Sequence, residues 1–234
     1  MTASEEIDII FEEVEDLLTE EACSDSESEK REFIEQGLKR ASRLLELAPD
    51  YHNKYHLHGL LWYHHPDKNQ QRSQRTKQFL RRAVDLSPTD SQFSVQYLGY
   101  IHFDEDNYAE ALKWFEQTDE DYFERDDRRW RWLKARELAL VCRGKIGHRI
   151  DLEQARSLAS EYVRAERENH NPALPTEIAE FARECIDQEL KDSSALAAVV
   201  VTMLEDLDLK FLVERNRLNQ RAEQDAAGQS ATAE

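Results

Sequence analysis

The segment that decides the fold spans residues 98–115 and reads LGYIHFDEDNYAEALKWF. Apolar residues recur at helical spacing on both sides of its acidic stretch 104–107, so we expect two helices joined by a turn. Gly99 and Ala111 are small, whereas Phe115 is large. We expect the small residues to let the two helices approach closely and the large residues to fill the space that remains.

Two earlier segments end in similar text, LELAP at residues 45–49 and VDLSP at residues 84–88. Pro49 and Pro88 are 39 residues apart. Because proline disfavours the helical conformation of the residue before it, each of them marks the end of a helix. A period of this length is typical of a repeated pair of antiparallel helices.

The composition favours helices along the whole chain. Its 234 residues include only 6 glycines and 5 prolines, and good helix formers are abundant. We therefore expect an all-α fold of about nine helices, with no strand, in one domain or at most two. Consecutive antiparallel helix pairs of this kind form an α-solenoid.

The expected organisation has four parts. We expect an acidic N-terminal helix and a polar break over residues 1–28, helical repeats over 29–168, C-terminal helices over 169–220, and a flexible polar tail over 221–234. The segment 169–175 is the clearest linker. Beyond it, one long helix from about residue 194 to residue 220 is expected to cap the solenoid or to pack against a second copy of the chain as a homodimer.

The segment 98–115 closely resembles the core of a tetratricopeptide repeat (TPR). The residues that occupy the motif positions are Leu98, Gly99, Tyr108, Ala111 and Phe115. The helix expected over residues 52–65 fits the same register, with Gly59 at the glycine position and Trp62 at the following aromatic position. Residues 126–164 match less well, so the resemblance covers about residues 30–165.

The resemblance implies a TPR-like α-solenoid closed by a C-terminal capping helix, and a non-enzymatic adaptor or scaffold that binds a segment of another protein. By register, its partner-binding groove would be lined by Asn53, His56, Leu60, Tyr63, Phe93, Gln96, Tyr100 and Phe103. Some TPR proteins hold a C-terminal carboxylate with Lys and Asn side chains at such positions, which here are His56, Leu60, Gln96 and Tyr100. We therefore expect an aromatic groove for an apolar or helical segment instead of that clamp.

A second, local resemblance concerns His65, Pro66 and Asp67, which match the HPD loop that J-domain co-chaperones use to contact Hsp70. The preceding helix lacks the basic face of that family, and the motif of its first helix is also missing. Proline ends helices and aspartate favours turns, so the same residues are also a natural helix stop. A co-chaperone that acts through this loop is the first alternative function.

The histidines suggest a second alternative. Five of them lie close together in the sequence, namely His52, His56, His58, His64 and His65. His52 and His56 are four residues apart on one helical face, which suits a divalent metal ion. A third ligand would have to come from His102 or from an acidic residue, because no cysteine lies nearby. An enzyme or metal-binding protein built on this cluster stays open, although we expect no metal and no cofactor.

A secondary charged surface is expected at Arg128, Arg129, Arg131 and Lys134, interleaved with Trp130 and Trp132. This pattern can bind nucleic acid through phosphate contacts and stacking. Acidic residues adjoin it at 119–121 and 126–127, so pairing within the chain or an acidic partner is the simpler interpretation. The formal net charge of −18 likewise disfavours nucleic acid and anionic membranes as partners.

Further patterns favour a cytoplasmic protein without catalytic residues. The three cysteines, Cys23, Cys142 and Cys185, form no CxxC motif, which fits a reducing compartment. Residues 1–21 contain no basic residue, so we expect no secretory signal, and the longest apolar run, 195–201, is too short to span a membrane. The chain has no glycine-rich phosphate loop, no GxSxG motif and no HExxH motif.

Overall fold

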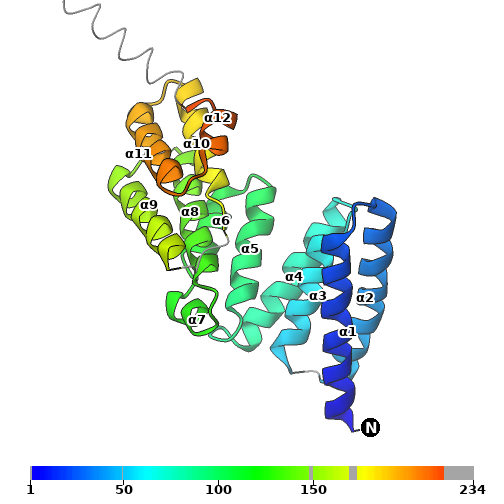
Figure 1. Ribbon diagram of the computed structural model, residues 1–234. Helices are drawn as coiled ribbons and strands as arrows, with labels where there is room; N and C mark the ends of the chain where they lie inside the picture. Colours follow the sequence, from blue (N-terminus) through cyan, green and yellow to red (C-terminus); the bar gives the residue numbers. More distant parts are fainter. Residues whose placement is uncertain (1, 49, 148–149, 169–172, 219–234) are drawn as a thin grey trace, which may run out of the picture. The chain divides into compact units, whose positions relative to one another are not determined.

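The computed structural model describes residues 2–48, 50–147, 150–168 and 173–218. Regular structure over these residues consists of twelve α-helices and no strand, which confirms the all-α class (Figure 1). The helices pack in neighbouring pairs, as in a solenoid. The chain divides into two compact units between Asn107 and Tyr108, a division that the sequence pattern did not indicate.

The first unit consists of five helices that follow one another in space as they do in the chain. They are α1 (Ala3–Cys23), α2 (Glu27–Leu47), α3 (His52–His64), α4 (Gln70–Leu86) and α5 (Gln92–Asp104). Each helix packs against the next one, and α3 also contacts α5. In Figure 1 these helices run from dark blue (α1) to green (α5). This serial packing gives α3 three neighbours, α2, α4 and α5.

Local sequence explains where these helices begin and end. Thr2 opens α1 with a capping box, in which its hydroxyl accepts the Glu5 N–H at 3.2 Å and the Glu5 carboxylate accepts the Thr2 N–H at 2.7 Å. The Asn69 side chain caps α4 by accepting a backbone N–H of its first turn at 2.9 Å. At its other end α4 stops at Leu86, two residues before Pro88, as expected.

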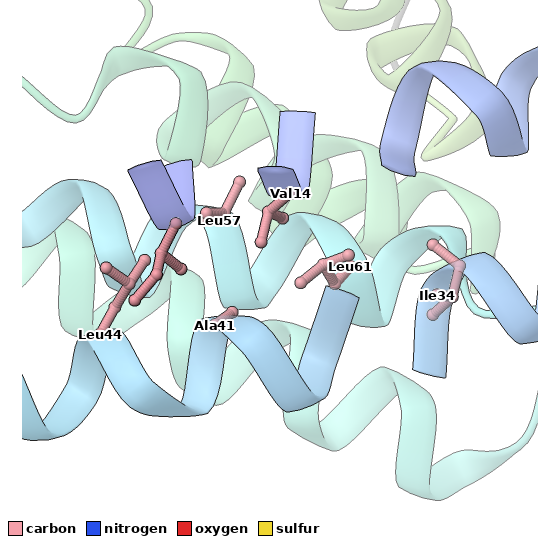
Figure 2. Close-up of a cluster of buried hydrophobic side chains, with 7 residues drawn as sticks. Val14, Ile34, Ala41, Leu44, Leu57 and Leu61 are labelled. Atoms are coloured by element: carbon pink, nitrogen blue, oxygen red, sulfur yellow. The ribbon is translucent and has the colours of Figure 1, made fainter. Parts of the chain in front are cut away.

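The core of the first unit joins its first three helices (Figure 2). Its buried residues are Ile10 and Val14 from α1, Ile34, Ala41 and Leu44 from α2, and Leu57 and Leu61 from α3. The acidic N-terminal helix therefore turns an apolar stripe towards its neighbours and most of its charges towards solvent, whereas Glu21 is buried. At about 25 cal/mol per Å² of apolar surface, burial of this kind is the main force that holds the three helices together.

Two glycines allow close contact between helices of this unit. A Cβ atom on Gly59 of α3 would lie 2.5 Å from Leu80 Cδ2 and 3.3 Å from the Leu80 backbone nitrogen on α4. A Cβ atom on Gly37 of α2 would lie 2.6 Å from Leu61 Cδ2 on α3. Carbon atoms pack best at separations of about 3.5–4.0 Å, so neither position accommodates a larger residue without a shift of its neighbour.

Replacing Gly59 by alanine tests this close approach. We expect Gly59→Ala to lower the free energy of unfolding by about 1–3 kcal/mol, because the added methyl group overpacks against Leu80. Leu80→Ala alone should cost about 2–5 kcal/mol through the loss of buried apolar surface. The double variant should cost clearly less than the sum, because it removes the clash, and urea unfolding of the three variants measures this coupling. Additive losses would show that the two residues do not interfere.

The second unit contains seven helices in the part that the structure describes. They are α6 (Tyr108–Phe115), α7 (Glu120–Arg125), α8 (Arg129–Lys145), α9 (Leu152–Arg167), α10 (Thr176–Asp187), α11 (Ser193–Asp206) and α12 (Lys210–Arg215). Helix α8 packs against α6, α7, α9 and α10, whereas α11 packs against α9, α10 and α12. Helices α5 and α6, which carry the segment that most resembles a TPR, thus belong to different units.

The C-terminal part of the second unit differs from the expectation of one long helix. Helices α11 and α12 take its place, separated at residues 207–209. Asp208 adopts the left-handed conformation (φ 56°), and the Leu209 N–H donates to the Leu204 carbonyl at 2.7 Å, which closes α11. Aspartate tolerates this conformation better than most residues, so no glycine marks the break. Helix α7 was also not expected, and the Asp119 carboxylate caps it.

Part of the expected organisation concerns residues that the structure does not describe. The tail 221–234, the end of the expected last helix (219–220) and residues 169–172 of the expected linker lie outside the described residues. Where the structure does describe the chain, no helix is both long and apolar enough to cross a membrane. The apolar run 195–201 lies in α11, with Leu196 and Val200 buried.

Candidate functional site

Helices α3 and α5 carry the residues that the sequence analysis assigned to a groove, and both lie in the first unit. Three polar contacts join α3 to α5 and to Ser91, the N-cap residue of α5. The Tyr63 hydroxyl donates to Asp104 Oδ2 at 3.1 Å, His56 Nδ1 lies 2.9 Å from Ser94 Oγ, and His52 Nδ1 lies 3.2 Å from Ser91 Oγ. The N-terminal ends of the two helices therefore lie beside each other, and so do their C-terminal ends, which means that α3 and α5 run parallel.

Aromatic rings form a row on these two helices. We define the α3/α5 face as the side chains of His56, Leu60, Tyr63, Phe93, Tyr97, Tyr100 and Phe103, all of which are half-buried. The Tyr97 ring centroid lies 5.2 Å from that of Tyr63, 5.5 Å from that of Tyr100 and 6.0 Å from that of His56. The three tyrosine rings meet edge to face, a favoured geometry of aromatic pairs.

The structure corrects one of the expected groove residues and adds another. Asn53, His56, Leu60, Tyr63, Phe93, Tyr100 and Phe103 are half-buried, whereas Gln96 is 0% exposed. The assignment of Gln96 to the groove is therefore wrong, because neighbouring atoms cover its amide. Tyr97 was missed, although its spacing of four residues from Phe93 and three from Tyr100 places it on the same side of α5.

A polar pocket of 710 Å³ adjoins the α3/α5 face at Tyr63. Its other lining residues are Lys68, Asn69, Gln70, Arg72, Ser73, Ile101, Asp104 and Glu105. Burial raises the pKa of the Asp104 carboxyl above its usual value. Burial acts on Glu105 in the same direction, but hydrogen bonds from Lys77 and Ser73 outweigh it and lower the Glu105 pKa. Cations, carboxylates and amides together suit the mixed polar groups of a peptide.

The His65–Pro66–Asp67 loop follows α3, and its polar groups are engaged within the first unit. The His65 ring stacks on Trp62, with centroids 5.5 Å apart, and its Nδ1 accepts the Asp67 N–H at 3.1 Å. The Asp67 carboxylate accepts two hydrogen bonds from the Arg31 guanidinium of α2, at 2.6 and 2.7 Å. These bonds hold the Asp67 pKa below its usual range. A helix stop tied to a neighbouring helix accounts for this geometry without a co-chaperone role.

The histidines of residues 52–65 contact different partners. His52 and His56 contact serines of the α5 segment, as described above. His58 packs on Phe79 of α4, with centroids 4.7 Å apart, and His64 Nδ1 lies 3.4 Å from a Glu21 carboxylate oxygen of α1. Among the residues that the structure describes, no three His, Cys, Asp or Glu side chains are grouped so that they could hold a metal ion.

His58 gives the first unit a pH dependence. Its ring is buried, and burial lowers its pKa from 6.5 to about 4. Between these values the unfolded chain binds a proton that the folded unit does not bind. The contribution of the neutral His58 ring to the free energy of unfolding is therefore fully present above pH 6.5 and decreases as the pH falls towards 4.

We expect His58→Leu to remove this part of the pH dependence. Between pH 7.0 and pH 4.5, the wild-type chain should lose about 2–3 kcal/mol more unfolding free energy than the variant, because a pKa difference of one unit corresponds to about 1.4 kcal/mol. Urea unfolding of both proteins at the two pH values measures this difference, in which the acidic residues common to both cancel. Equal losses in the two proteins would contradict the assignment.

Two arginines of the expected secondary charged surface are paired within the second unit. Arg129 Nε donates to Glu120 Oε1 at 2.9 Å, and its guanidinium also binds Glu161. Arg128 Nε lies 3.3 Å from Asp126 Oδ2. These pairs neutralise much of the positive charge that the sequence suggested. The structure thus agrees with the expectation of pairing within the chain.

Lys134 belongs to a buried network that joins α8, α9 and α10. Its amino group lies 2.9 Å from Glu137 Oε2 and also binds Glu177. Glu137 is fully buried and accepts hydrogen bonds from the Tyr162 hydroxyl at 2.7 Å and the Ile178 N–H at 2.9 Å. Burial acts to lower the Lys134 pKa, but the two carboxylates outweigh it and raise that pKa. The fourth predicted residue, Arg131, lies over the Trp130 ring, 4.9 Å from its centroid.

Removing the carboxylate at the centre of this network should destabilise the second unit. We expect Glu137→Ala to lower the free energy of unfolding by about 3–5 kcal/mol, because it leaves buried donors without their acceptor. Glu166→Ala, at an exposed position of α9, is the matched control and should change stability by less than about 0.5 kcal/mol. Urea unfolding followed by circular dichroism measures both, and similar small effects would exclude a structural role for the network.

Comparison with known proteins does not assign the chain to a family. No protein-family model matches the chain, and no curated protein matches it. The resemblance to a TPR therefore depends on the residues quoted from the sequence, and the α3/α5 face is the feature from which a function can be inferred.

Proposed function

We propose that the chain is a non-enzymatic adaptor or scaffold that binds a segment of another protein on the α3/α5 face. The observation that carries this proposal is the row of half-buried aromatic side chains that two parallel helices display together. Aromatic residues dominate the binding energy of many protein interfaces, because they bury a large area and lose few rotamers on binding. A row held by contacts between its own members needs little reorganisation when a partner binds.

The polar pocket complements this row. An apolar side chain of the bound segment would pack against Tyr97 and Tyr100, and polar groups of the same segment would reach Lys68, Arg72 or Asp104 in the pocket. An apolar centre with a polar margin is the usual composition of a protein interface. The acidic net charge would influence the rate of association and the choice of partner more than the affinity.

The TPR-like register supports the same proposal. In TPR proteins the first helix of each pair lines the partner-binding groove. Helices α3 and α5 would be two such first helices, and the close approach of Gly59 to Leu80 on the second helix of the first pair agrees with the glycine position of the motif.

Capture of a partner from the native cells tests the proposal. The tagged full chain should retain a stoichiometric partner at moderate salt, identified by mass spectrometry. Tyr100→Ala combined with Phe103→Ala should reduce its recovery by at least about tenfold, because the change removes two aromatic contacts of the face.

Phe211→Ala is the matched control, since Phe211 is an aromatic residue of the second unit that is 52% exposed. It should leave partner recovery unchanged, and circular dichroism should show that all variants retain the helical content of the wild type. If a folded Tyr100→Ala/Phe103→Ala variant recovers the partner as well as the wild type does, the α3/α5 face is not the binding site. Recovery of Hsp70 that is lost on His65→Gln would favour the co-chaperone alternative instead.

A further inference from the structure

A groove lies between α9 and α11 of the second unit, apart from the α3/α5 face. Its volume is 850 Å³, and its lining residues come from segments 156–168 and 195–206. Each segment covers about three helical turns, roughly 17 Å at 1.5 Å per residue. The groove is therefore long enough to receive three turns of another helix.

The floor of the groove is apolar. Val163 of α9 and Val199 of α11 are half-buried, Ala198 is exposed, and Met203 is buried beneath them. A volume of this size is in the usual range of ligand pockets, about 300–1,000 Å³, and holds several apolar side chains at once.

The rim of the groove on α9 is basic. Arg156, Arg164 and Arg167 line it and are exposed. Arg164 binds Glu161 at 2.6 Å, whereas Arg156 and Arg167 form no ion pair with any residue that the structure describes. Glu168 and Asp206 also line the groove. Because Arg164 is already paired, Arg156 and Arg167 are the two rim charges that favour acidic residues in a partner.

Backbone chemistry favours a helix over an extended segment in this groove. An extended segment has unpaired N–H and C=O groups, and both sides of the groove are helices whose own backbone groups are already paired. A helix satisfies its backbone hydrogen bonds internally, so it can place one face on an apolar floor without leaving donors unpaired.

Two segments of the same chain do not fit as occupants. The acidic helix α1 has the right charge, but its apolar residues Ile10 and Val14 are buried in the core of the first unit. The sequence 219–234 contains no Val, Leu, Ile, Met or aromatic residue that could fill the floor. Neither segment is therefore expected to occupy the groove.

We propose that the groove between α9 and α11 binds an amphipathic helix of a partner protein, with the apolar face of that helix on Val163, Ala198 and Val199 and acidic residues beside Arg156 and Arg167. This surface is separate from the α3/α5 face, so the two proposals can fail independently.

A designed peptide of about 18 residues tests this assignment, with leucines on one helical face and glutamates on both flanks. The control peptide has lysine in place of each glutamate. Binding to the full chain is measured by fluorescence anisotropy. The acidic peptide should bind saturably, and more tightly than the lysine peptide by about tenfold.

Two variants locate the site, and two others serve as controls. The double variant Arg156→Glu/Arg167→Glu should weaken the binding of the acidic peptide by about tenfold and strengthen the binding of the lysine peptide. Ala198→Arg leaves the rim arginines in place and adds one positive charge, but its side chain fills the floor, so it should weaken the binding of both peptides by at least about tenfold. Arg183→Glu, on the exposed side of α10 and outside the groove lining, is the charge-matched control and should bind as the wild type does. The variant Tyr100→Ala/Phe103→Ala, which changes the α3/α5 face, is the second control and should also bind both peptides as the wild type does.

Several results would overturn the proposal. One is the absence of saturable binding by the acidic peptide, and another is equal affinity for the two peptides. Binding that survives Ala198→Arg in a folded variant would place the peptide elsewhere. A wild-type dimer that Ala198→Arg converts to a monomer would show that a second copy of the chain occupies the groove.

Discussion

The packing of helix α3 is the interaction on which the first unit depends, because α3 packs against α2, α4 and α5 and shares a hydrophobic core with α1. Leu57 and Leu61 face the core shared with α1 and α2, Gly59 admits Leu80 of α4, and His56 bonds with Ser94 of the α5 segment. A helix enclosed in this way has no single polar face, so its polar residues must be matched one by one. Lys54 illustrates this, since it is buried and donates to the Leu45 carbonyl at 3.4 Å. His52, His56 and His64 each have a polar partner on a neighbouring element, whereas the buried Nδ1 of His58 has no hydrogen-bond partner among the described residues.

The sequence was sufficient for the all-α class and for the helix end before Pro88, since these depend on local chemistry. It was not sufficient for the break at Asp208, where an aspartate adopts a conformation that glycine usually signals. For the candidate site, helical periodicity selected side chains of α3 and α5 that the structure leaves half-buried, with the exception of Gln96. Periodicity does not tell how much of a side the neighbours cover, which is why Gln96 was assigned wrongly. Pairing between Arg129 and Glu161, 32 residues apart, likewise needs the tertiary structure.

The two candidate surfaces differ in chemistry. The α3/α5 face consists of rings that contact one another beside a pocket of mixed charge, whereas the groove between α9 and α11 has an aliphatic floor and an arginine-rich rim. They also belong to different units of the chain. A protein with two such surfaces would bring two ligands to one polypeptide, and linkage of this kind raises the effective concentration of each near the other.

The left-handed residue that closes α11 belongs to a wider pattern. Asp106, Asp127, Glu189 and Asp208 all have positive φ, and they follow the last residues of α5, α7, α10 and α11. Four helices therefore end beside an acidic side chain, at the negative end of the helix dipole, where such a charge is unfavourable. Dissolved ions screen interactions between exposed charges over about 8–10 Å. These helix ends are therefore expected to fray most in dilute buffer and to become firmer as ionic strength rises towards that of the cell.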